Sequence, residues 1–107
     1  MSSLLIRNAV KSDCPLIFDF IKQLAEYEKL PHLVTAHVEL LEKNLFSVNS
    51  HVHVLIAEYE SKPAGFALYF YNFSTFLGKQ GIYLEDLFVI PELRSKGIGI
   101  SMINLIS

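Results

Sequence analysis

The chain has 107 residues and a net charge of −2, so it is long enough for one domain and lacks the basic surface of a nucleic-acid-binding protein. Hydrophobic residues make up 51% of it and charged residues 19%, a balance typical of a packed globular domain. Cys14 is the single cysteine, which excludes an internal disulfide and favours a reducing compartment. Residues 1–7 lack the long apolar region of a signal peptide, and no apolar run approaches the roughly 20 residues of a membrane span. We therefore expect one cytoplasmic domain, residues 1–107, with no membrane or nucleic-acid partner.

The first half of the chain predicts one strand followed by two helices. Residues 4–7 are aliphatic and indicate a short strand. Ser12 and Asp13 offer capping oxygens and Pro15 suits a first helical turn, so a helix should run from there to about Lys29. Thr35 is expected to cap a second helix, which ends before residues 49–50.

The second half predicts three strands and a closing helix. The expected elements, in order, are a strand at 51–59, a hairpin turn at 60–63, a strand at 65–73, a loop at 72–81, a strand at 82–90 and a helix at 98–106. The 82–90 strand is apolar on both faces, as in a strand that is covered on both sides. The order β-α-α-β-β-β-α predicts an α/β fold with a mostly antiparallel sheet and helices on its faces. The last helix has no stop signal before Ser107, which indicates a pattern cut short.

The most informative motif is the run Arg94-Ser95-Lys96-Gly97-Ile98-Gly99, between the last strand and the last helix. A glycine-rich turn that opens a helix presents free backbone N–H groups at the positive end of the helix dipole, which favours phosphate binding. The run is neither a Walker loop nor a complete dinucleotide-binding fingerprint. The alternative interpretation is a tight strand-to-helix turn without a ligand.

Several other polar residues could carry chemistry. Glu85 and Asp86 are neighbours on a strand, so their side chains should point to opposite faces and cannot act as a pair on one atom. A carboxylate inside an apolar strand is costly unless it is partnered or functional. The four histidines share no ligand spacing, so we expect no metal site. Tyr69 and Tyr71 suit packing on a strand face, and Cys14 suits a structural position.

The chain resembles the GCN5-related N-acetyltransferase (GNAT) superfamily, and within it the diamine (spermidine/spermine and thialysine) N-acetyltransferases. The family signature, Arg/Gln-x-x-Gly-x-Gly/Ala, corresponds to residues 94–99. The other matching stretches are Ile6-Arg7, Asp13-Cys14, Ile21-Lys22, Leu24-Ala25, Tyr27-Glu28, Gly65-Phe66-Ala67, Tyr83-Leu84-Glu85-Asp86 and Phe88-Val89. The resemblance extends over all 107 residues, whereas family members continue further, with a fifth strand and later elements.

The resemblance implies a site for acetyl-CoA as co-substrate, with no metal. The backbone partners that it implies for the pyrophosphate are Ser95, Lys96, Gly97, Ile98, Gly99 and Ile100, with positive charge from Arg94 and Lys96. Pantetheine would pair with Leu87, Phe88 and Val89, and the Leu87 N–H would polarise the thioester carbonyl.

The resemblance also implies an amine site. Glu85 would bind the amine and help to remove its proton, which must leave before nitrogen can attack. Tyr27 and Glu28 would line the acceptor pocket, although they equally suit an ordinary surface helix end, and Asp86 suits a structural role. The family's general acid, a tyrosine beyond the fifth strand, has no counterpart in this chain.

Three functions therefore remain open at the level of sequence. The first is an N-acetyltransferase of small primary amines, impaired by the missing part of its site. The second is a CoA-binding remnant without turnover. The third is a structural module that dimerises, and the open 82–107 region leads us to expect a homodimer in any case.

Overall fold

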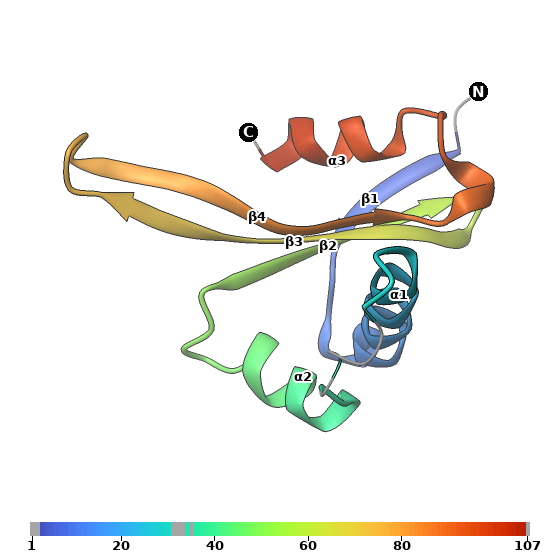
Figure 1. Cartoon of the computed structure of the whole chain (residues 1–107), viewed down its shortest axis with the longest axis horizontal. Coiled ribbons are helices and arrows are strands. Elements are labelled where there is room, and N and C mark those ends of the chain that lie inside the picture. The colour runs from blue at the N-terminus through green and yellow to red at the C-terminus, as the bar shows by residue number, and fades with distance from the viewer. Residues whose placement is uncertain (1–2, 31–33, 35, 107) are drawn as a thin grey trace. The chain divides into compact units, whose positions relative to one another are not determined.

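A computed structural model describes residues 3–30, 34 and 36–106, which form two compact units (Figure 1). The first unit combines the N-terminal strand with everything from His51 onward, and the second comprises residues 9–50. The order of elements along the chain is the predicted one, β-α-α-β-β-β-α. No helix in the described part of the chain is long and apolar enough to cross a membrane.

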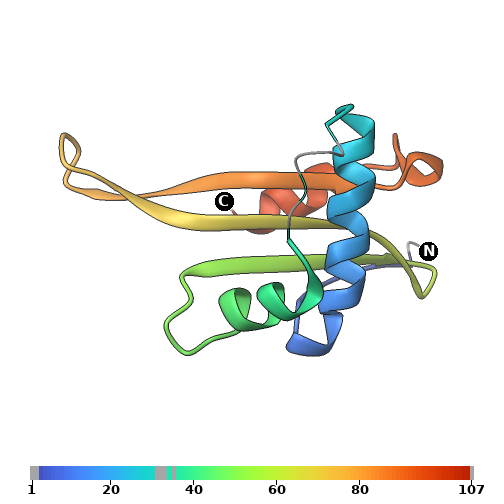
Figure 2. The same cartoon turned by 60° about the horizontal axis from the view of Figure 1, so that its bottom comes forward.

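The first unit is a four-stranded antiparallel sheet with one helix (Figures 1 and 2). Its elements are β1 (Leu4–Asn8), β2 (Val52–Tyr59), β3 (Lys62–Ser74), β4 (Lys79–Val89), the short 3₁₀ helix η3 (Pro91–Leu93) and α3 (Ile98–Ile106). The strands are ordered β1-β2-β3-β4, so β1 and β4 are the edges of the sheet. Figure 1 shows α3, in red, lying along one face of the sheet.

The core of this unit lies between α3 and the sheet, where small strand residues allow the helix to approach closely. The buried members are Leu55, Ala57, Ala64, Ala67, Ile98 and Met102. Met102 has no exposed surface and Ile98 is 2% exposed. Burial of these two side chains supplies much of the energy that fixes α3, because its exposed residues contribute little. Their packing therefore also fixes the turn that precedes α3.

The turn between β2 and β3 is shorter than the predicted segment 60–63. Glu60 and Ser61 alone connect the strands, with φ angles of 52° and 66°. Two consecutive residues with positive φ match the type I′ turn, whose twist suits a two-residue hairpin. Lys62 and Pro63 already belong to β3, and Pro63 is tolerated there because a bulge interrupts the ladder beside it.

The predicted loop at 72–81 was wrong, because β3 and β4 continue through most of it. Asn72 pairs with Gly81, and the strands meet only at the turn after Ser74. Gly78 closes this turn with φ 66° and donates its N–H to the Ser74 carbonyl at 2.8 Å. Polar residues and glycine suggested a loop, but pairing between the two strands of an exposed hairpin arm satisfies the hydrogen bonds of the backbone N–H and C=O groups in this segment.

The expectation that the 82–90 strand is covered on both sides was also wrong for its first half. Residues 82–85 are exposed, and Leu84 is 37% exposed. The register shifts between Leu68 and Tyr69 of β3, opposite Asp86 and Leu84, so Glu85 is the extra residue of a β-bulge. The bulge shifts the phase of the alternation and brings Leu84 to the same face as Leu87. Because the alternation changes at Glu85, the sequence pattern suggests apolar residues on both faces of β4, although the strand is not covered on both faces.

The second unit contains α1 (Cys14–Tyr27), α2 (Val38–Leu45) and the short 3₁₀ helix η1 (Lys11–Asp13). Asp13 stands at the N-cap of α1, but its carboxylate accepts from the Val10 N–H at 2.7 Å and caps η1 instead. Pro15 lies in the first turn of α1 as predicted. The helix ends at Tyr27, two residues before the predicted end.

The end of α1 is a Schellman motif built without glycine. Lys29 has φ 61°, and the N–H of Leu30 donates to the Ala25 carbonyl at 2.8 Å. This motif stops the helix sharply and leaves Tyr27 and Glu28 exposed in its last turn.

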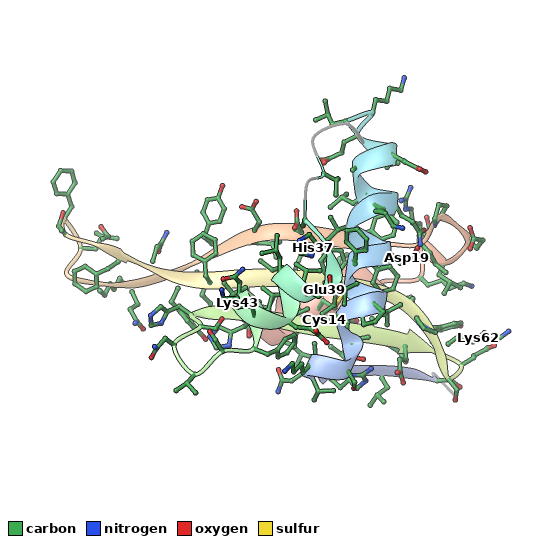
Figure 3. The ribbon with its side chains drawn as sticks, turned by 90° about the horizontal axis from the view of Figure 1, so that it is seen from below. Cys14, Asp19, His37, Glu39, Lys43 and Lys62 are labelled. Atoms are coloured by element: carbon green, nitrogen blue, oxygen red, sulfur yellow. The ribbon has the colours of Figure 1, made fainter. Side chains whose placement is uncertain are left out.

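The second helix begins at Val38 with His37 at its N-cap, labelled in Figure 3. The His37 Nδ1 accepts the Leu40 N–H at 3.4 Å and lies 3.0 Å from a Glu39 carboxylate oxygen. Thr35, predicted as the cap, lies outside the described residues. The backbone N–H of Glu39 itself, followed by the neighbouring His37 imidazole, lowers the pKa of the Glu39 carboxyl.

Candidate functional site

A cavity of about 320 Å³ opens where β4 ends and α3 begins. It is lined by Leu87, Val89, Leu93, Arg94, Ser95, Gly97, Ile98, Gly99 and Ile100. The structure therefore brings together all the predicted cofactor-binding residues except Phe88 and Lys96. Leu93 was missed, because it precedes the glycine motif, and the apolar residue in the turn after Pro91 was its only signal. A concave site with apolar walls and backbone donors is typical of a small-molecule site.

The backbone of the loop is arranged to present N–H groups. Ser95 has φ 70° and Gly97 has φ 78°, so the chain twice enters the left-handed region. The Ser101 N–H donates to the Gly97 carbonyl at 3.0 Å, which is the i→i−4 bond that opens α3. The N–H groups of Ile98, Gly99 and Ile100 precede this bond, so they have no partner within the helix. Convergent N–H groups at a helix start form an anion site.

The two glycines play different parts. An ideal Cβ at Gly97 would contact no protein atom within 4 Å, but the positive φ disfavours any other residue there. A Cβ at Gly99 would lie 3.7 Å from Leu87 Cδ2 and 3.9 Å from Val89 Cγ2, which is ordinary contact. Gly97 is therefore required by the backbone, whereas Gly99 has room for a methyl group.

The last residues of β4 offer their backbone to the cavity at the free edge of the sheet. The Ile90 N–H donates to the Ala64 carbonyl on β3 at 2.8 Å. Because successive residues of a strand point their N–H and C=O groups to alternate sides, those of Leu87 and Val89 face away from β3. Leu87 and the N–H of Val89 can pair with an extended ligand as a further strand would, because the Val89 carbonyl already accepts from Arg94. Phe88 faces β3 with its backbone, and its side chain is 4% exposed.

The two cations of the loop lie against the protein. The Arg94 Nε donates to the Val89 carbonyl at 2.9 Å, and its guanidinium carbon lies 5.6 Å from the centre of the Phe88 ring. The Lys96 Nζ lies 5.6 Å from the centre of the Tyr59 ring. In this structure the two cations therefore contact a backbone carbonyl and aromatic rings, whereas their predicted contribution of charge to a phosphate site stays a prediction.

The predicted amine-site residues lie on different elements. Glu85 is exposed at the bulge of β4 and does not line the cavity. Because of the bulge, simple alternation no longer places Glu85 and Asp86 on opposite faces, so that argument fails here. Asp86 is half-buried. Tyr27 is 66% exposed beside Glu28 at the end of α1, in the second unit.

The tyrosines of β3, His53 and Cys14 pack against other side chains of the protein. His53 stacks on Tyr69, with ring centres 5.2 Å apart, and meets Tyr71 edge-on at 5.4 Å. Desolvation, followed by the neighbouring Tyr71, raises the pKa of Tyr69. Cys14 is fully buried, and burial raises the pKa of its thiol. The described residues contain no cluster of three potential metal ligands, and His32 lies outside them.

Comparison with known proteins identifies the family. The model of the Acetyltransferase (GNAT) family matches residues 17–106. The chain therefore belongs to the GNAT family of acetyltransferases, and its resemblance to that family and its α/β fold are confirmed.

Two curated relatives are similar over most of this chain. The chain is 38% identical to the thialysine N-epsilon-acetyltransferase of Mus musculus, covering 100% of this chain and 67% of the relative. It is 34% identical to the spermidine/spermine N(1)-acetyltransferase-like protein 1 of Homo sapiens, covering 95% of this chain and 16% of that protein. The chain thus spans about two thirds of the thialysine acetyltransferase.

Solved structures show the same fold. An aminoglycoside acetyltransferase from an uncultured soil metagenomic sample matches with a TM-score of 0.78 at 22% identity, covering 97% of this chain and 67% of that one. A predicted acetyltransferase of Clostridium acetobutylicum, solved with acetyl-CoA, matches with a TM-score of 0.77 at 19% identity, covering 95% and 70%.

Proposed function

We propose that this chain uses acetyl-CoA to acetylate the primary amine of a small polyamine-like or diamine-like molecule. The observation that carries the proposal is the cavity in which the glycine-rich loop and the free edge of β4 meet. The names of its relatives, which act on thialysine or resemble spermidine/spermine acetyltransferases, support the class of amine.

The cofactor fits the two kinds of donor at this cavity. Backbone N–H groups of residues 95–100 bind the pyrophosphate, whose charge the helix dipole of α3 stabilises. The pantetheine arm lies along the outer edge of β4 and pairs with Leu87 and Val89. The Leu87 N–H then polarises the thioester carbonyl and stabilises the oxyanion that forms when nitrogen attacks.

The amine side uses residues outside this cavity. Glu85 takes a proton from the substrate ammonium, directly or through water, so that the neutral nitrogen attacks the carbonyl carbon. The C–S bond then breaks, the amide nitrogen loses its second proton to water, and the CoA thiolate takes a proton from water and leaves as the thiol. Tyr27 and Glu28 line the acceptor pocket, where Glu28 attracts the ammonium of the acceptor, and Asp86 has a structural role.

An exposed apolar surface supports a proposal that the chain associates with itself. Several large apolar side chains of β4 and α3 are exposed, among them Ile82, Ile100, Ile103 and Leu105. Exposed apolar patches beside an open strand edge favour association. We therefore propose a cytoplasmic homodimer in which residues 1–107 belong to a single acetyltransferase domain, without nucleic acid, membrane or metal as a partner.

Calorimetric titration with CoA, followed by turnover of acetyl-CoA with spermidine or thialysine, tests the proposal. Saturable CoA binding with amine-dependent release of CoA supports the enzyme. Binding without turnover favours a CoA-binding module, and a dimer that binds no CoA favours a structural module. The last result would refute the cofactor assignment altogether.

A further inference from the structure

Arg94 occupies a position at the candidate site that its charge does not explain. It is half-buried, lines the cavity, and reaches back to the strand that precedes it. Its Nε donates to the Val89 carbonyl at 2.9 Å, five residues earlier in the chain. Its guanidinium carbon also lies 5.6 Å from the centre of the Phe88 ring.

These two contacts place the side chain across the free edge of β4. The carbonyl of Val89 faces outward from the sheet, as the inward-facing N–H of Ile90 requires. Phe88 and Val89 project their side chains to opposite faces of the strand. A side chain that donates to the outward carbonyl of Val89 and also lies over the ring of Phe88 must therefore wrap around the edge of the strand.

This wrapping has two geometric consequences. It closes η3 and the loop onto the end of β4, so the N–H groups of residues 95–100 are held next to the strand edge. It also occupies an edge carbonyl at Val89, so strand-like pairing of an extended ligand continues no further along β4 at that point. The ligand must leave the edge there and turn toward the loop.

A direct ionic role for Arg94 would look different. Of the five N–H donors of the guanidinium, the Nε–H donates to a backbone carbonyl and is therefore not available to an anion in the cavity. An N–H donor in the right place is what the Val89 carbonyl needs, and net charge is not. Lys96, exposed on the same loop, supplies a matched positive charge without that bond.

We infer that Arg94 is a positioning residue: it clamps the glycine-rich loop to the outer edge of β4, and its hydrogen bond to Val89, not its charge, sets CoA affinity. This inference rests on the proposed function, because it concerns the same cofactor site. It adds the point at which strand pairing of the cofactor ends and loop binding begins.

Three substitutions separate the hydrogen bond from the charge. Arg94→Gln keeps an N–H donor the same number of bonds from the backbone as the arginine Nε, without charge. Arg94→Lys keeps the charge but moves the donor one bond further out. Arg94→Met keeps length and apolar volume without either. Lys96→Gln removes one positive charge from the same loop and serves as the control for charge.

The measurements are CoA affinity by calorimetry at two ionic strengths, and the exchange of the Arg94 Nε–H with water in the ligand-free protein by NMR. We expect the CoA affinity of Arg94→Gln to stay within about threefold of wild type. Its dependence on salt should also be unchanged, because screening acts only on charge. Arg94→Lys and Arg94→Met should bind CoA at least tenfold more weakly than wild type. The Nε–H of the wild type should exchange slowly before CoA is added.

The outcomes discriminate clearly. If the Lys variant binds CoA as well as wild type and the Gln variant does not, the charge matters and the inference is wrong. Fast exchange of the Nε–H would also overturn it. If wild type binds no CoA although its Nε–H is protected, the proposed function itself fails. Should the Met variant not fold, the comparison of Gln with Lys still decides.

Discussion

The clearest test of the candidate site compares the same small change at its two glycines. Alanine at either position adds one methyl group. At Gly97 this methyl group meets no protein atom within 4 Å, whereas at Gly99 it makes ordinary contact with Leu87 and Val89. Only Gly97 has a positive φ, at 78°. The two variants therefore differ in backbone strain and in what the methyl group faces.

The expected magnitudes follow from these two differences. Gly97→Ala forces an L-residue into the left-handed region, which costs about 1–2 kcal/mol of stability, less the roughly 0.4–1 kcal/mol gained through a less flexible unfolded chain. Gly99→Ala should be neutral or slightly stabilising, because alanine favours the helix over glycine. For CoA, Gly97→Ala should weaken binding at least tenfold, or about 1.4 kcal/mol, by blocking approach to the loop. Gly99→Ala should stay within about threefold.

The assay pairs calorimetric CoA affinity with urea unfolding for each variant. Gly97→Asn is a further control, because asparagine tolerates positive φ better than alanine while it still adds a Cβ. It should recover part of the lost stability without recovering affinity. The reasoning would be refuted if the folded Gly97→Ala protein bound CoA as wild type does, or if Gly99→Ala lost as much affinity.

Three further predictions concern the core, the amine site and the cysteine. Met102→Ala should lower the free energy of unfolding by about 2–5 kcal/mol, because Met102 is fully buried. Leu105→Ala is the control: this side chain is 63% exposed, so its loss should change the free energy of unfolding by less than about 0.5 kcal/mol. Equal effects of the two variants in urea unfolding would contradict the packing of α3. Glu85→Gln should lower turnover and shift its pH profile while CoA affinity stays constant, and loss of CoA binding would show that Glu85 is structural. Native Cys14 should react with a thiol reagent at pH 8 far more slowly than in urea. Since its pKa is raised on folding, its contribution to stability is complete below about pH 8.5 and falls as the pH rises further; an unchanged stability above that pH would argue against it.

The sequence predicted the elements that local pattern determines. The strand before Pro91, the glycine pair and the apolar spacing of α3 each favour one local structure, and the structure has a strand, a turn and a helix there, with a cavity between them. The order of strands followed because consecutive strands joined by hairpins are neighbours. The residues that line the cavity were predicted except for Leu93, whereas Phe88 and Lys96 were predicted and do not line it. That this cavity binds CoA stays a prediction.

The features that sequence reasoning missed depend on cross-strand register. Glu85 is an extra residue in β4, and nothing in the alternation of that strand alone marks where the phase shifts. The hairpin arm through Asn72 and Gly81 forms because the two strands pair with each other, although neither segment favours a strand by itself. The orientation of Arg94 depends on a carbonyl exposed by the same strand edge. Such features require the partner strand before they can be seen.

The long separation between β1 and β2 has a consequence for the order in which the sheet assembles. β2, β3 and β4 follow one another through short turns, whereas Asn8 pairs with Leu55 across about 46 residues that hold the whole second unit. Closing a loop of that length costs about 3.4 kcal/mol of chain entropy by the (3/2)RT ln n estimate, and a two-residue hairpin avoids most of it. The three-strand meander is thus the local part of the topology, and β1 contributes its non-local contacts. Changes in the length of the segment between β1 and β2 should affect the rate at which β1 joins far more than they affect the glycine-rich loop, whose cavity is lined by residues between Leu87 and Ile100.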